Sequence, residues 1–164
     1  FVATGLLHDA QLQPEKRLRQ LSAEGLSRSL TVNAVGPALV AKHFLPLLRR
    51  PGKSVFAALS ARVGSIEDNQ LGGWYGYRAS KAALNMLLRT AAIELARTHP
   101  EAVCVGLHPG TVDSALSSPF QRGVPPERLF TPAFSAQKLL RVVGALGADD
   151  TGQLFAWDGQ RIPF

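Results

Sequence analysis

The sequence predicts an α/β fold in which the strands of a parallel sheet are connected by crossover helices. Short apolar runs that suit strands covered on both faces alternate with longer stretches whose apolar residues recur every three or four positions. Proline and glycine, as in Pro51-Gly52, mark the points at which one pattern stops. A regular alternation of strands and helices is typical of a parallel sheet.

Each expected element has its own local signal. Pro37 lies inside the first expected helix and should bend it, because proline has no N–H to donate. Thr131-Pro132 is typical of a helix start, with a capping side chain followed by proline in the first turn. The expected strands lie at residues 1–6, 54–60, 102–107 and 153–157. The expected helices lie at about residues 22–49, 77–96 and 131–146.

Composition indicates one globular domain. The chain has 164 residues, of which 46% are hydrophobic and 18% charged. No apolar run reaches the length needed to cross a membrane, so no membrane association is expected. The single cysteine, Cys104, lies in an apolar run, which predicts a buried strand residue and excludes a disulfide within the chain. A reducing, cytoplasmic location fits this cysteine usage.

The net charge of +6 allows two kinds of partner. A basic protein can bind nucleic acid, but the basic residues here are not clustered with aromatic side chains, and a phosphate-bearing small ligand explains the sign equally well. We therefore expect no nucleic-acid partner and keep such binding only as the weakest alternative. His8 and His108 have no metal-ligand partners at a fixed spacing, so no metal is expected.

The strongest chemical signal is the pair Tyr77 and Lys81. On a helix these residues stand at positions i and i+4, which puts the phenol and the ammonium on one face, one turn apart. A nearby cation favours the phenolate and should lower the pKa of the tyrosine, as a proton-transferring tyrosine requires. Without further support, such a pair is more commonly an ordinary solvated surface pair.

That support comes from the expected sheet. Parallel α/β sheets carry their chemistry at the carboxyl ends of the strands. Those ends are Thr4-Gly5, residues 60–65 and residues 109–112. Together with Asn33 and the Tyr77 pair, they can converge on one edge of the sheet.

These motifs, in this order, resemble the short-chain dehydrogenase/reductase family, and most closely its C-factor-like branch. The matching pieces are Ala3-Thr4-Gly5, Val32-Asn33-Ala34, Tyr77-Arg-Ala-Ser-Lys81 and Pro109-Gly-Thr-Val112. The resemblance covers essentially all 164 residues. It implies a Rossmann-like doubly wound sheet in which residues 1–164 are the C-terminal part of a single domain. The later four strands and three main helices would be present, and the first βαβαβ half would be absent.

The resemblance also implies roles for individual residues. Tyr77 would exchange a proton with the oxygen of a small-molecule carbonyl or alcohol. Lys81 would hold the nicotinamide ribose of NAD or NADP, and Asn33 would fix a water that continues the proton relay to Lys81. The backbone of Pro109, Gly110, Thr111 and Val112, with the Ser114 hydroxyl nearby, would face the nicotinamide. A homodimer or higher homo-oligomer through the helices of Asn33 and Tyr77 is also implied.

The chain departs from the family pattern in two places. Ala61 stands where the catalytic serine is usual, so Ser60 and Ser65 are the remaining candidates. The glycine-rich turn that receives a pyrophosphate is also missing, and the chain begins with Phe1 inside an apolar run, as the later part of a longer protein would. Either the absent half or another chain should cover the open edge of the first strand.

Two functions follow from this combination. The first is an NAD(P)-dependent oxidoreductase, present as a fragment that lacks the cofactor pyrophosphate site. The alternative is a non-catalytic dimerisation or signalling module on the same scaffold.

Overall fold

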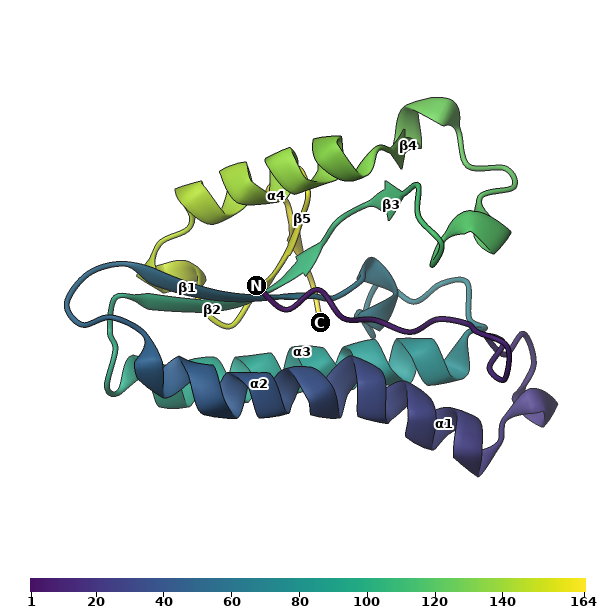
Figure 1. Ribbon diagram of the computed structural model, residues 1–164, viewed down its shortest axis with the longest axis horizontal. Coiled ribbons are helices and arrows are strands. Elements are labelled where there is room, and N and C mark those ends of the chain that lie inside the picture. Colours follow the sequence, from purple (N-terminus) through teal and green to yellow (C-terminus); the bar gives the residue numbers. More distant parts are fainter.

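The structure is a computed structural model that describes all of residues 1–164. A mostly parallel sheet forms its middle layer, with strands in the spatial order β1-β2-β5-β6. The strands are β1 Ser54–Leu59, β2 Ala102–His108, β5 Leu154–Ala156 and the antiparallel β6 Arg161–Ile162. The α-helices are α1 Ala23–Leu30, α2 Gly36–Phe44, α3 Tyr75–Ala96 and α4 Pro132–Ala145. Helices α1, α2 and α3 lie on one side of the sheet and α4 on the other, which confirms the predicted α/β fold (Figure 1).

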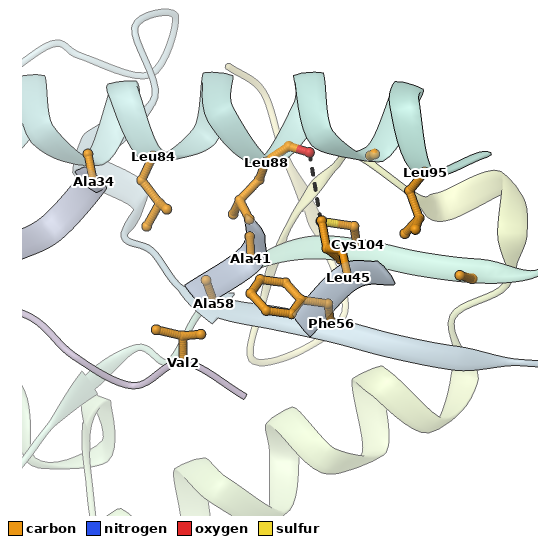
Figure 2. Close-up of a cluster of buried hydrophobic side chains, with 12 residues drawn as sticks. Val2, Ala34, Ala41, Leu45, Phe56, Ala58, Leu84, Leu88, Leu95 and Cys104 are labelled. Carbon is orange, nitrogen blue, oxygen red and sulfur yellow. Dashed lines mark hydrogen bonds between the residues drawn. The ribbon is translucent and has the colours of Figure 1, made fainter. Parts of the chain in front are cut away.

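The two faces of the sheet bury different side chains because successive strand residues point in opposite directions. On one face, Phe56 and Ala58 of β1 pack with Leu84 and Leu88 of α3 (Figure 2). On the other face, a second cluster joins the sheet to α4; its members include Ala57, Val103, Val105, Leu139 and Val142. The sheet is therefore covered on both faces, and this is why its strands read as continuous apolar runs.

Cys104 belongs to the α3 side of this core. Its Sγ lies 3.8 Å from the Leu88 carbonyl, to which the thiol donates (Figure 2). The cysteine is free and fully buried, and burial raises the pKa of its thiol to about 12. The predicted buried strand cysteine is confirmed, and a thiol in this state is unreactive.

The first expected helix is divided in two. Ser22 caps α1, since its Oγ accepts a hydrogen bond of 3.0 Å from Gly25 N. A π-helical turn over Thr31–Val35 then separates α1 from α2, and Pro37 lies in the first turn of α2. The irregularity falls just before the proline, as its missing N–H predicts.

The prediction of a strand at residues 1–6 was wrong. Only Val2 pairs with the sheet, through hydrogen bonds of 2.8 Å from Val2 N to Ala57 O and from Leu59 N to Val2 O. Beyond Val2 the chain leaves β1, and Leu6 bonds the side chain of Asn33 instead. Contacts with residues distant in sequence thus limit the strand pairing to Val2, although the apolar character of residues 1–6 suggested a full strand.

Three short strands were not predicted. One is β6, which forms a hairpin with β5 through Gly159 at φ 87°. The other two are β3 Thr111–Val112 and β4 Leu129–Phe130, which pair in parallel beyond the end of β2. In Figure 1 they lie on the same side of the sheet as α4. None of the four α-helices has the length and sustained hydrophobicity of a membrane-spanning segment.

Candidate active site

Tyr77 and Lys81 stand one turn apart at the start of α3. The Nζ atom of Lys81 lies 5.7 Å from the centroid of the Tyr77 ring and donates a hydrogen bond of 2.8 Å to Leu59 O at the end of β1. Both residues line a cleft of about 650 Å³ at the carboxyl ends of β1 and β2. The predicted geometry of a phenol and an amine on one helix face is therefore present, with open space in front of them.

Gly64 allows the loop after β1 to lie directly against α3. A Cβ atom at this position would come within 2.8 Å of the carbonyl carbon and of Cβ of Lys81. Such a contact is too short for real atoms, so any side chain here would push the loop away from the helix. The glycine thus brings the end of β1 to the Tyr77 pair.

The pKa values of the pair differ from the expectation. Burial raises the pKa of Tyr77 to about 12, and burial lowers the pKa of Lys81 to about 8. The loss of hydration of each side chain therefore outweighs the attraction between ammonium and phenolate that was expected to lower the tyrosine pKa. At neutral pH the phenol is protonated, and the amine releases its proton far more readily than a solvated lysine does.

Glu15 caps the helix that carries Tyr77. Its carboxylate Oε2 accepts a hydrogen bond of 3.0 Å from Gly76 N, and its backbone oxygen accepts one of 2.5 Å from Trp74 N. No side chain of α3 itself makes such a cap. A carboxylate at a helix N-terminus also interacts favourably with the helix dipole. Glu15 lies 61 residues away in sequence from Gly76, and no local spacing pointed to it.

The backbone before Tyr77 is held in an unusual conformation. Gly72, Gly73 and Trp74 have successive φ values of 64°, 66° and 52°. For a residue with a Cβ atom, the left-handed region costs about 1 kcal/mol or more. Arg78 offsets part of this cost, because its guanidinium donates to the carbonyl oxygens of Gly72, Gly73 and Val63 at 2.9–3.3 Å. The loop thus fixes where the Trp74 side chain lies.

Asn33 is fully buried beside this region. Its Oδ1 accepts from Leu6 N and its Nδ2 donates to Leu6 O, both at 2.7 Å, and Nδ2 also donates to Ser80 Oγ at 3.0 Å. The side chain therefore joins the N-terminal segment to α3 and does not contact Lys81 directly. A Cβ atom on Gly5 would lie 3.8 Å from both Asn33 Oδ1 and Lys81 Nζ, so the two side chains approach the same glycine.

Ser60 lines the same cleft as Tyr77, but neither Ser60 nor Ser65 forms a hydrogen bond with Tyr77. The hydroxyl of Ser60 donates to Asn85 Oδ1 at 2.6 Å in the interior, and Ser65 Oγ accepts from Asp68 N at 3.0 Å. Ala61, which has no hydroxyl, also lines the cleft. The cleft thus has a methyl group at the position where a serine hydroxyl was sought.

The predicted cofactor turn closes the opposite side of the cleft. Pro109, Gly110, Thr111, Val112 and Ser114 all line it. Gly110 has φ 78°, and a Cβ atom there would come within 2.6 Å of the Phe130 ring. The Ser135 hydroxyl donates to Pro109 O at 2.8 Å, so α4 holds the turn in place.

His108 is a cleft residue whose role the sequence did not indicate. Its Nδ1 is buried and has no hydrogen-bond partner. Burial lowers the pKa of His108 to about 4; Arg62 lowers it further and Asp158 opposes both. A neutral imidazole therefore borders the cleft near the Pro109 turn.

The residues present can accept a nicotinamide ribose. Lys81 has three N–H donors when protonated, and Leu59 O is its one protein acceptor in the structure. The remaining donors can serve sugar hydroxyls, and the Pro109 turn supplies backbone groups on the facing wall. No cluster of three or more metal-ligating side chains occurs in the structure.

Comparison with known proteins agrees with this geometry. The family model described as Enoyl-(Acyl carrier protein) reductase matches residues 4–145. The C-signal protein of Myxococcus xanthus is 36% identical over 85% of this chain and 78% of its own length. A Rhodococcus protein, 1-hydroxy-2-glutathionyl-2-methyl-3-butene dehydrogenase, is 32% identical over 82% of this chain. The NADPH-bound carbonyl reductase from chicken fatty liver superposes with a TM-score of 0.81 at 28% identity, over 98% of this chain.

The chain is shorter than most of these relatives. It spans 56% of the Rhodococcus dehydrogenase and 63% of the chicken carbonyl reductase, against 78% of C-signal. The matched region includes both the Tyr77 pair and the Pro109 turn, since residues 4–145 contain them.

Proposed function

The chain belongs to the short-chain dehydrogenase/reductase family of NAD(P)-dependent oxidoreductases, and on that premise we propose that it transfers hydride between NAD(P) and a carbonyl or alcohol substrate. The observation that carries the proposal is the Tyr77–Lys81 pair on one face of α3, with the 650 Å³ cleft in front of it. The cofactor supplies the hydride. The residues of the chain supply alignment and the proton.

Tyr77 acts as the proton donor to the substrate oxygen. Its pKa of about 12 keeps the phenol protonated at neutral pH, which suits reduction of a carbonyl more than oxidation of an alcohol. Lys81, held by Leu59 O, directs its free N–H donors to the ribose. Since Ala61 has no hydroxyl, Tyr77 is left as the principal donor to the carbonyl oxygen at this wall.

Asn33 and the Pro109 turn support these two residues. The backbone carbonyl of Asn33 receives no hydrogen bond from Pro37 four residues on, because proline has no N–H. This carbonyl can hold a relay water, while the Asn33 side chain fixes the local backbone through Leu6 and Ser80. Residues 109–112 and Ser114 face the nicotinamide, which can belong to NAD or NADP.

Residues 1–164 form the later part of a single short-chain dehydrogenase/reductase domain, and the chain acts as a homodimer. Support for the dimer comes from large apolar side chains exposed on and just after α2 and on α3: Leu39, Phe44, Leu47, Met86 and Ile93. A cytoplasmic location fits the buried free thiol of Cys104.

A second candidate function is a non-catalytic dimerisation or signalling module. It is favoured by Ala61 at the serine position and by the hydroxyls of Ser60 and Ser65, which are already hydrogen-bonded to Asn85 and to Asp68 N. The name of the related C-signal protein points in the same direction.

Calorimetric titration with NADPH and NADH discriminates the two functions. It should be performed on this chain and, side by side, on any longer form that its gene encodes. Saturable binding that weakens at least about tenfold in Lys81→Met supports the oxidoreductase, since two ribose hydrogen bonds would be lost. Absence of binding in every form removes the oxidoreductase and leaves the non-catalytic module.

A further inference from the structure

The part of the cleft next to Tyr77 is walled by aromatic rings from separate segments. The rings of Trp74 and Phe120 meet edge to face, with centroids 5.0 Å apart, and those of Trp74 and Tyr77 do so at 6.3 Å. All three residues line the cleft. Building on the proposed function, we infer that Trp74 and Phe120 form an aromatic subsite that selects carbonyl compounds bearing a flat apolar group, such as aryl ketones.

Half of the residues that line the cleft are hydrophobic. Leu7, Ala61, Val63, Leu116 and Val124 contribute hydrocarbon surface, and no carboxylate lines any part of the cleft. A flat ring on the substrate gains the most binding free energy from such a wall, because it buries apolar area and makes edge-to-face contacts with the rings of Trp74 and Phe120.

Each of the two cationic side chains of the cleft, Arg62 and Lys81, has one partner in the protein. Arg62 Nη1 lies 3.3 Å from Asp68 Oδ2, and Lys81 Nζ bonds Leu59 O on the side of the expected ribose. A carboxylate on the substrate would have to displace Asp68 or compete with the cofactor. The subsite therefore favours an uncharged substituent over an anionic one.

The wall is built before any ligand binds. The backbone of Trp74 is fixed by Glu15 O, and the preceding glycines are fixed by Arg78. Phe120 packs on His8 with ring centroids 5.4 Å apart. Rings held in this way select a ligand by shape at little ordering cost.

The subsite also compensates for Ala61. Without a serine hydroxyl, one fewer hydrogen bond orients the carbonyl oxygen toward Tyr77. Contacts between the aromatic wall and the substituent must then provide more of the orientation. The same rings thus serve both selection and alignment.

Ligand-observed ¹⁹F NMR tests the inference directly. The protein is titrated with 4′-fluoroacetophenone and, separately, with 3-fluoropyruvate, and dissociation constants are obtained from line broadening. We expect the ketone to bind at least about tenfold more tightly than the oxo acid, and Phe120→Ala to weaken ketone binding about fivefold. Phe134→Ala is the matched control, because it removes a partly exposed ring that does not line the cleft and should change nothing.

Three results would overturn the subsite. They are absence of ketone binding, equal or tighter binding of fluoropyruvate, and unchanged binding in Phe120→Ala. Phe120→Leu, which keeps apolar bulk without a ring, replaces the alanine variant if circular dichroism shows that the latter is unfolded. The ketone titrations need no cofactor, whereas the comparison with fluoropyruvate is made with saturating NADP⁺, so that the ribose occupies Lys81. Ketone binding without NADPH binding would therefore contradict only the proposed oxidoreductase. NADPH binding together with an unchanged ketone affinity in Phe120→Ala would contradict only the subsite.

Discussion

The amine of Lys81 faces the ring of Tyr77 at 5.7 Å while it donates a hydrogen bond to the Leu59 carbonyl at the end of β1. Helix α3 and strand β1 thus both hold the Lys81 amine in place. The same burial moves the two pKa values apart, because it raises that of the phenol to about 12 and lowers that of the amine to about 8. Both groups therefore favour their neutral forms more strongly than they do in water. At neutral pH the phenol keeps the proton that it can donate, and the ammonium beside it loses its proton more readily than that of a solvated lysine.

Replacing Tyr77 by phenylalanine should abolish turnover of a carbonyl substrate. The ring keeps its packing against Trp74, but the proton on the phenol is lost. Melting temperature and NADPH affinity should stay close to those of the unchanged protein. Tyr75→Phe is the control, since Tyr75 is exposed and outside the cleft. Full activity of Tyr77→Phe in a coupled NADPH assay would show that another group donates the proton.

Ala61→Ser should increase the rate of reduction. A hydroxyl at this cleft-lining position can donate to the carbonyl oxygen beside Tyr77, and one such donor is worth about 10²-fold in favourable cases, so an increase of about tenfold or more is expected. Ser60→Ala should leave kcat unchanged and reduce stability by about 1–2 kcal/mol, because Asn85 loses its buried partner. A fall in kcat for Ser60→Ala with no gain for Ala61→Ser would return the catalytic hydroxyl to Ser60.

The local parts of this site could be read from the sequence. The Tyr77–Lys81 spacing depends only on helix geometry, and the Pro109 turn depends only on a strand ending at a proline and a glycine. For the same reason, the boundaries of β1, α3 and α4 agreed with expectation to within a few residues. The turn signals around these elements are strong and close in sequence.

The parts of the fold and of the site that depend on contacts between residues distant in sequence could not be predicted from the sequence. Glu15 caps α3 only because the fold brings together positions 61 residues apart. The apolar run at residues 1–6 looked like a strand, yet its pairing ends at Val2 because Asn33 takes the backbone groups of Leu6. The pKa of Tyr77 moved in the unexpected direction because a sequence shows the neighbouring charge but not the loss of water around it.

A charged substitution on α2 should dissociate the proposed dimer. Phe44 is 59% exposed at the end of α2, so Phe44→Asp would place a carboxylate in an apolar interface. Sedimentation should change from a dimer to a monomer, with an association at least about a hundredfold weaker. Leu140→Asp is matched in exposure at 59% but lies on α4, across the sheet, and should leave the dimer intact. A chain that is monomeric before any substitution contradicts this interface.

Lys81→Met should remove a contribution of Lys81 that makes the folded protein more stable at pH 10 than at pH 8. The unfolded chain binds the Lys81 proton below about pH 10.5, but the folded chain binds it only below about pH 8. Lowering the pH through this window therefore favours the unfolded chain, and the contribution of Lys81 falls by about 2 kcal/mol from pH 10 to pH 8. Cys104 acts in the opposite direction, because its thiol ionises near pH 9 in the unfolded chain but has a pKa of about 12 in the folded chain, and Tyr77 does the same from about pH 10. Both residues are present in the variant as well, so the difference between the two proteins isolates Lys81. Urea denaturation at pH 8, 9 and 10 measures the effect, with the exposed Lys16→Met as control. If the free energy of unfolding changes by the same amount across this range in Lys81→Met and in the unchanged protein, the amine is not desolvated in the folded protein.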